Sequence, residues 1–575
     1  MGALRLMRLA GKGLGLAVKA GVMGLSLKAS RQAAVGAFAA ELRKANLPPE
    51  TIAQLCDSQG YQETQRRINH WLERLPHSRR FVRLASGGAC SFAYLKDLPP
   101  RRRITTYSTY VCQIRGGGVV FARLEEFILE KLSETKLPSL TAAVVKGEEV
   151  VWARAFGFKD VARGLPATTK TLYGIGSVTK SFTALAIMQL AEQGKLRLDD
   201  PVDLHVPFPV RPQGERVTIL HLLTHSSGIP ALAYAEAVIR GRTGAQDNWL
   251  PIASYSDLVT FMQDANDWTL FKPGERWFYL NEGYAALGAV IEKCAGVPYE
   301  DYVRTHILLP LGMDRSFFGK AAVEKDSDVA VPYVITRTGE QMPSTYAYGG
   351  LTADGALISN IYDLARYAAM YLGGGKFGQT RVLGEDGIKA MQEPRIALPY
   401  QGNFGSRYYA LGLFNTPAFY GRTLIDHGGS VLVATAFMGF VPEEGLGVVL
   451  LANGSGYPLS QIGQYALCLL LGQEPAELPF IALERELTAL TGVYETYKGT
   501  MRVQVKKAGS LLMLENKDKY NDTTAPLLVE DLSGAHKRFY TLNTGVRVPI
   551  EFAVSDKGIE LIYERYLLRR VGKLG

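Results

Sequence analysis

Hydrophobic periodicity begins clearly near residue 120 of the 575-residue chain. Apolar positions at helical spacing run from Leu124 to Leu132, and two apolar strand-like runs follow at 142–145 and 150–153. Lys146-Gly147-Glu148 separates the two runs as a turn. The pattern predicts a helix followed by a β-hairpin at the start of a folded domain.

Further helices and a late hairpin are predicted downstream. Helical periodicity covers three stretches, 180–193, 283–295 and 361–372. A second hairpin is expected from 433–440 and 447–451, turned at Pro442 to Gly445. Strands thus lie at both ends of this region, and helices lie between them. This order predicts one antiparallel sheet that is closed by the two termini of the region, with a helical half beside it. The fold class is therefore α+β in mixed arrangement, over residues 119–475.

Short strands dominate the sequence after about residue 485. Met501, Val503 and Val505 alternate with polar residues, which is typical of a half-buried strand. Further strand-like runs lie at 511–515, 546–554 and 559–568. We therefore expect a separate small β-domain over residues 485–575.

The first 118 residues differ from the rest in charge. They contain 19 Lys and Arg against 6 Asp and Glu, although the whole chain carries only +9. Residues 32–57 are predicted to be helical, whereas 58–118, with Gly, Pro and Arg runs, are read as linker or irregular structure. Residues 1–118 thus form a basic leader and linker, partly helical.

This basic leader bears on location and partners. In residues 1–31, lysines interrupt the apolar runs well short of the roughly 20 residues that a membrane span needs. An organellar transit peptide and an amphipathic helix lying on anionic lipid both stay open. Nucleic-acid binding is disfavoured, because its basic patch would belong on the folded domain.

Composition and cysteines narrow the class of protein. Hydrophobic residues make up 47% and charged residues 21%, which is typical of a globular chain and excludes a disordered one. The five cysteines form no Cys-x-x-Cys pair, so neither a disulfide framework nor a thiolate zinc site is indicated. A reducing compartment is favoured, either the cytoplasm or an organelle.

A serine and a lysine open the helix predicted at 180–193. In Ser177-Val178-Thr179-Lys180 the hydroxyl and the amine are just under one turn apart, so they share a helix face at its N-terminal end. A serine hydroxyl needs a base to take its proton, and a lysine of lowered pKa can be that base. The same spacing in Ser133 to Lys136 lies at the end of a helix and is read as a solvated surface segment.

Two later segments carry complementary chemistry. Tyr279-Leu280-Asn281 is expected on a loop before the helix near Gly283, where a phenol can relay a lysine's proton and an amide can hold substrate and lysine together. Asp426-His427-Gly428-Gly429-Ser430 precedes an apolar strand expected at 431–440, and its glycines allow close backbone approach. The backbone N–H groups of Ser430 and Ser177 would then form an oxyanion hole.

These segments, in this order, resemble the motif set of the serine β-lactamase, penicillin-binding-protein, DD-peptidase and D-aminopeptidase family. The resemblance covers roughly residues 121–470, and the C-terminal part is similar to the lipocalin-like barrels of some family peptidases. It implies Ser177 as nucleophile and Lys180 with Tyr279 as the proton-transfer pair. It also implies a set of substrate-binding residues: Asn281, His427, Gly428 and Gly429.

One position departs from the β-lactamase pattern. Where β-lactamases use a lysine to attract a substrate carboxylate, His427 is a weaker and pH-dependent cation. Esterase or peptidase activity is therefore favoured over efficient β-lactam hydrolysis. A catalytically silent scaffold or binding module, anchored by the basic N-terminus, is the alternative.

No cofactor or metal is expected. His221 and His225 have the spacing of a zinc-binding helix, but Leu222 stands where the zincin pattern needs Glu. The expected partners are a small-molecule or peptide substrate and, optionally, further copies of the chain. The β-domain either covers the cleft or mediates assembly.

Overall fold

The computed structural model describes residues 84–86, 89–91 and 118–573, except 247–249, 348, 457, 518, 520 and 521. The chain divides into two units, residues 1–111 and 112–575. Of the first unit only β1 (Leu84–Ser86) and β2 (Ala89–Ser91) are described, and these pair antiparallel. The predictions for residues 1–31 and 32–57 and for most of 58–118 lie outside the described residues.

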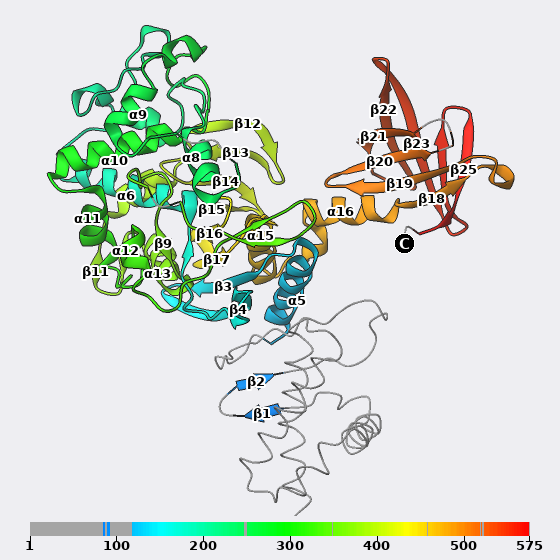
Figure 1. The fold of residues 1–575 in the computed structure, drawn as a ribbon, viewed down its shortest axis with the longest axis horizontal. Helices are drawn as coiled ribbons and strands as arrows, with labels where there is room; N and C mark the ends of the chain where they lie inside the picture. Colours follow the sequence, from blue (N-terminus) through cyan, green and yellow to red (C-terminus); the bar gives the residue numbers. More distant parts are fainter. Residues whose placement is uncertain are drawn as a thin grey trace, which may run out of the picture. The chain divides into compact units, whose positions relative to one another are not determined.

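A nine-stranded antiparallel sheet forms the centre of the larger unit (Figure 1), in the order β12-β13-β14-β15-β16-β17-β3-β4-β5. Its strand β17 pairs with β3, with Leu446 opposite Lys146. The first and last strands of the domain are thus neighbours, which confirms the predicted mixed fold with a sheet closed by its two ends. The nine strands are β3 (Ser139–Lys146), β4 (Glu149–Asp160), β5 (Leu165–Pro166), β12 (Ile396–Gly402), β13 (Gly405–Tyr409), β14 (Phe414–Phe419), β15 (Arg422–Ser430), β16 (Thr435–Val441) and β17 (Leu446–Ala452).

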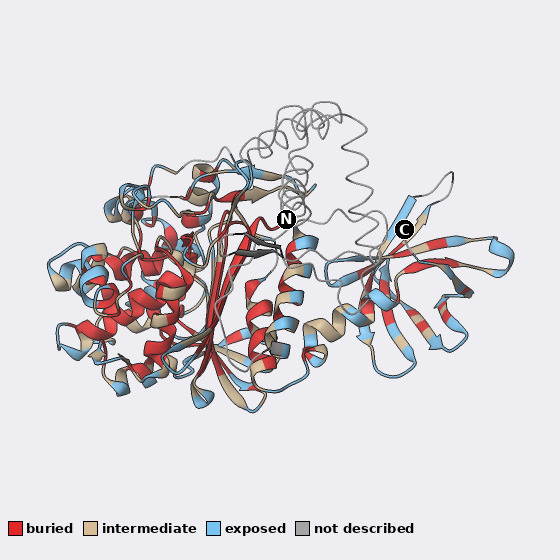
Figure 2. Cartoon of the chain, turned by 90° about the horizontal axis from the view of Figure 1, so that it is seen from below, coloured by how far each residue is buried: buried red, intermediate tan, exposed pale blue. Residues whose placement is uncertain are grey.

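Helices cover both faces of this sheet, so its central strands are buried on both sides (Figure 2). Ala142 and Val144 of β3 face a core shared with α5 (Gly118–Thr135) and α15 (Leu459–Leu470). Ala143, between them, faces the opposite core. Burial on both faces explains why β3 and β17 read as continuous apolar runs rather than alternating ones.

The helical half packs around α6 (Thr179–Glu192), whose residues from Thr179 to Leu190 are all buried. A helix buried on every side shows little amphipathicity, as its sequence does. Helix α6 contacts α10 and α11. The other helices of this half are α7 (Ile219–Leu223), α8 (Tyr234–Thr243), α9 (Tyr255–Phe261), α10 (Asn281–Ala295), α11 (Tyr299–Val303), α12 (Lys320–Val323), α13 (Ile361–Leu372) and α14 (Glu385–Gln392). No helix within the described ranges is long and apolar enough to cross a membrane.

Short strand pairs fasten the loops around this core. β6 (Tyr173–Gly174) pairs with β9 (Ile358–Ser359) and leads directly into the turn that carries Ser177. The other two pairs join β7 (Tyr333–Ile335) to β8 (Gln341–Pro343) and β10 (Lys376–Phe377) to β11 (Thr380–Arg381).

A closed eight-stranded barrel with its own core follows helix α16 (Pro479–Ala489), as the C-terminal β-pattern predicts. The run expected at 559–568 is two strands, because Glu564 adopts a left-handed φ of 52° and turns the chain. The barrel strands are β18 (Gly492–Glu495), β19 (Arg502–Ala508), β20 (Leu511–Lys517), β21 (Asp522–Asp531), β22 (His536–Asn543), β23 (Val546–Ser555), β24 (Gly558–Tyr563) and β25 (Tyr566–Gly572).

Candidate active site

Ser177 and Lys180 meet at the start of the buried helix α6. Ser177 lies in a short 3-10 turn, Gly176–Val178, and Lys180 in the first turn of the helix that follows. Nζ of Lys180 is 3.1 Å from Oγ of Ser177. The helical spacing predicted from the sequence therefore brings hydroxyl and amine into hydrogen-bonding contact.

Lys180 is fully buried, and its amine has two further partners. Nζ donates to Oδ1 of Asn281 at 2.8 Å and to the backbone carbonyl oxygen of Asp354 at 2.6 Å. Burial lowers the pKa of Lys180 to about 8, and the Asp354, Glu236 and Glu282 carboxylates oppose this effect. Roughly a tenth of these amines is therefore neutral at pH 7, far more than for an ordinary lysine.

Tyr279 lies beside the same two groups. Its side chain hydrogen-bonds that of Ser177, and Nζ of Lys180 is 4.9 Å from the centre of its ring. Burial raises the pKa of Tyr279 above its usual value, although the hydrogen bond to Ser177 opposes the shift. The phenol consequently keeps its proton at neutral pH and is available as a donor.

His225 holds the Tyr279 segment in position, a role that its sequence spacing did not suggest. Its carbonyl oxygen accepts from the N–H of Phe278 at 2.8 Å, and its Nδ1 accepts from the N–H of Leu280 at 3.0 Å. The two bonds flank Tyr279, whose ring centre lies 4.1 Å from that of His225. His225 is distinguished by its burial and by a left-handed backbone conformation, with φ 56°. A sequence displays neither property, so this role could not be read from it.

The zinc-helix reading of His221 and His225 does not fit this geometry. Helix α7 ends at Leu223, so the two histidines do not share a helix face. His221 caps α7 by accepting from the N–H of Thr218. Across the described ranges, no three His, Cys, Asp or Glu side chains converge as metal ligands.

The third segment ends a strand instead of preceding one. Residues 426–430 form the end of β15, and the next strand begins only at Thr435, so the strand expected at 431–440 is wrong at its start. A Cβ on Gly429 would lie 1.8 Å from the carbonyl oxygen of Ile175, and one on Gly176 would lie 2.7 Å from the N of Ser430. Glycine is required at both places for the strand to reach the serine turn.

His427 is buried and uncharged. Its Nδ1 lies 2.6 Å from the carbonyl oxygen of Gly428, which can only accept, so Nδ1 carries the proton. Its Nε2 then accepts from the hydroxyl of Tyr409 at 3.0 Å. Burial, followed by the charges of Lys180 and Arg407, lowers the pKa of His427 to about 3. The pH-dependent cation expected at this position is therefore absent near neutral pH.

A cavity of about 630 Å³ opens over these groups. Ser177, Tyr279 and Asn281 line it from the helical side. On the sheet side lie Arg407 and the buried Asp426, joined by a 2.6 Å ion pair. The cavity is large enough for a small peptide or ester, and charge of both signs is available in its wall.

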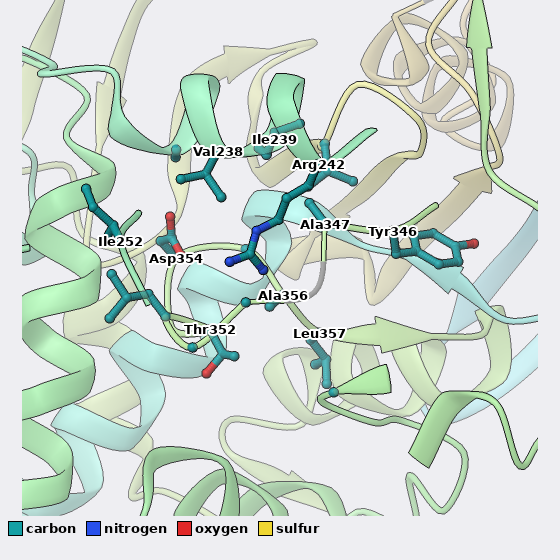
Figure 3. Close-up of a pocket in the computed structure, with 18 of the residues that line it drawn as sticks. Val238, Ile239, Arg242, Ile252, Tyr346, Ala347, Thr352, Asp354, Ala356 and Leu357 are labelled. Carbon is teal, nitrogen blue, oxygen red and sulfur yellow. The ribbon is translucent and has the colours of Figure 1, made fainter. Parts of the chain in front are cut away.

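A smaller cavity, of about 80 Å³, adjoins the first one (Figure 3). Arg242 extends from α8 into its middle, with Asp354 on one side and Tyr346 on the other. Asp354 and Ile239 line both cavities. The hydroxyl of Tyr234 donates to the Asp354 carboxylate at 2.8 Å and so helps to position the carbonyl that holds Lys180.

The fold and the comparisons with known proteins place this chain in the superfamily of serine β-lactamase and penicillin-binding-protein-like hydrolases. Residues 123–469 match the Beta-lactamase family model, and the chain belongs to that family. Residues 475–569 match the Pab87 octamerisation domain.

Individual relatives agree with this assignment. The octameric penicillin-binding protein homologue from Pyrococcus abyssi is 46% identical, with a TM-score of 0.74 over 78% of this chain and 99% of that structure. Penicillin-binding protein 4* of Bacillus subtilis (strain 168) is 27% identical over 76% of this chain and 95% of the relative. A D-stereospecific amidohydrolase from Streptomyces sp. shares the fold, at 23% identity and a TM-score of 0.51 over 61% of this chain and 99% of that one.

Two adjacent glycines of β15 allow a matched test of the close approach. We expect Gly429→Ala to destabilise the fold by about 1–3 kcal/mol, because its Cβ would overlap the Ile175 carbonyl. Gly428→Ala should leave stability nearly unchanged, since its Cβ would meet nothing closer than 3.9 Å. Urea denaturation of the two variants measures the difference. Equal stability would mean that the strand does not approach the serine turn this closely.

Proposed function

We propose that this chain hydrolyses esters or amides, including peptides, through an acyl-enzyme on Ser177. The observation that carries the proposal is the arrangement around the Lys180 amine. In its neutral form Nζ has two hydrogens and one lone pair. The two hydrogens are accounted for by Asn281 and the Asp354 carbonyl, so the lone pair is left to face Oγ of Ser177, 3.1 Å away.

Acylation would begin with proton transfer from Ser177 to Lys180 as Oγ attacks the substrate carbonyl. Negative charge then develops on the carbonyl oxygen, and the backbone N–H groups of Ser177 and Ser430 would stabilise it. Tyr279, protonated and hydrogen-bonded to Ser177, would pass a proton to the leaving group. Water activated through the same Lys180 and Tyr279 pair would release the acyl group.

Substrate choice follows from the neutral state of His427. A substrate carboxylate gains little from an imidazole whose pKa lies near 3, so a β-lactam loses the attraction that a lysine gives at this position. Asn281, His427, Gly428 and Gly429 would instead bind an uncharged acyl portion. Esterase or peptidase activity is thus favoured over efficient β-lactamase activity.

The catalytically silent scaffold is not favoured. A buried lysine without a chemical role carries a desolvation cost that a binding module has no reason to retain. In this chain the amine is fully buried and lies against the serine hydroxyl.

We also propose that the barrel assembles several copies of the chain. Support comes from the match of residues 475–569 to an octamerisation domain and from the octameric state of the Pyrococcus abyssi relative. The barrel has its own hydrophobic core, separate from those of the hydrolase domain. Assembly is therefore favoured over a cover for the cleft as the role of this domain.

The nucleophile can be tested with a matched serine. Ser177→Ala should abolish labelling by a fluorophosphonate probe, because no other activated serine is expected. Ser133→Ala should label like the natural protein: Ser133 is exposed, and Nζ of Lys136 bonds only its carbonyl oxygen. Intact-mass spectrometry counts the adducts. An adduct that persists in Ser177→Ala would remove Ser177 from its role, and failure to label the natural protein would favour the scaffold.

Assembly can be tested by ending the chain after Glu484. This end point keeps Phe480 and Ile481, which pack on the hydrolase core, and the Lys131–Glu484 ion pair. We expect the full-length chain to be oligomeric and the shortened chain to be monomeric, while both label with fluorophosphonate. Light scattering after gel filtration gives the two masses. An unchanged oligomer would show that the barrel does not mediate assembly.

A further inference from the structure

A cysteine, a histidine and an aspartate line up outside the serine site. Sγ of Cys294 is 3.5 Å from Nδ1 of His205, and Nε2 of His205 is 3.1 Å from Oδ2 of Asp200. Cys294 lies in the last turn of α10 and is partly exposed, whereas His205 and Asp200 come from the segment that follows α6. Asn281 begins the same helix thirteen residues earlier, about 20 Å away, so this cluster is distinct from the serine site.

The order of these groups fits a thiol with a general base. A carboxylate can only accept, so Nε2 of His205 carries a proton and donates a hydrogen bond to Asp200. Nδ1 is then left as the acceptor facing the sulfur. Asp200 is itself fixed, because its Oδ2 also accepts from the N–H of Arg197 at 2.8 Å. Weak nucleophiles are generally activated by an adjacent base that a third group orients. Cys294, His205 and Asp200 are arranged as such a nucleophile, base and orienting carboxylate.

The surroundings of the sulfur make such a base necessary. Burial and then the Asp200 carboxylate raise the pKa of the Cys294 thiol, while Lys195 and Lys293 act against them. The thiol is therefore protonated at neutral pH, and it must lose its proton as it attacks. The same two lysines supply a positive surrounding for an approaching anionic reagent.

We propose that Cys294 is a second nucleophile of this chain, which forms a mixed disulfide with small disulfides that carry carboxylates, the chemical class of oxidised glutathione. The sulfur attacks one sulfur of the disulfide while its proton passes to Nδ1 of His205. The new S–S bond joins Cys294 to one half of the reagent, and the original S–S bond breaks. The departing thiolate takes the proton from His205, so one thiol is consumed and one is released.

The test uses the full-length protein with glutathione disulfide as the probe. At pH 7, peptide-level mass spectrometry should find the mixed disulfide on Cys294 forming faster than on the fully buried Cys468, and not at all in Cys294→Ser. His205→Asn should slow formation by about a hundredfold, the lower end of general-base effects. The loss of rate in His205→Asn should shrink as the pH is raised, because the thiol then ionises without help from a base. Asp200→Asn should slow formation of the mixed disulfide less than His205→Asn does, with the same pH dependence.

The charge of the reagent gives a second arm. Cystamine, a cationic disulfide of similar reactivity, should react more slowly than glutathione disulfide, and Lys195→Gln with Lys293→Gln should reduce that difference. Fluorophosphonate labelling checks that each variant is folded, since none of these residues contacts the serine site. Three results would each overturn the proposal: no adduct on Cys294, an equal rate in His205→Asn at pH 7, or a deficit that does not change with pH.

Discussion

The burial of one amine beside one hydroxyl is the constraint on which the site depends. A lysine taken out of water is costly as a cation, so it needs hydrogen-bond partners and its pKa falls. In this chain Asn281 and the carbonyl of Asp354 are those partners, and they come from α10 and from the loop before β9. The sheet and the helical half must both close on α6 for the amine to be buried, which couples the chemistry to the whole domain.

The other residues of the site hold backbone segments in place around that amine. His225 fixes the residues on either side of Tyr279, and Gly176 and Gly429 let β15 reach the serine turn. In each case the group that is positioned is a main-chain atom. Small displacements of these segments would change the distances among hydroxyl, amine and phenol, so the precision of the site rests on tight backbone packing rather than on many side-chain contacts.

The sequence predicted what depends on local spacing and missed what depends on burial. The contact between Ser177 and Lys180 follows from helical geometry, and the hairpins follow from apolar runs bounded by turns. Asp354 could not be found, because it holds Lys180 through a carbonyl that every residue has. The neutral state of His427 needed knowledge of its burial, and β15 was misplaced because its glycines continue a strand that sequence propensity would break. The split of residues 559–568 needed the left-handed turn at Glu564.

The lowered pKa of Lys180 can be measured by titrating the amine itself. Nitrogen NMR of ¹⁵N-lysine protein, with the Lys180 signal assigned by its loss in Lys180→Arg, follows Nζ as the pH is raised. We predict a midpoint near pH 8, well below that of ordinary lysines. A midpoint at or above about 10.4, the ordinary lysine value, would contradict it, because Lys180 would then be a permanent cation and could not accept the proton of Ser177.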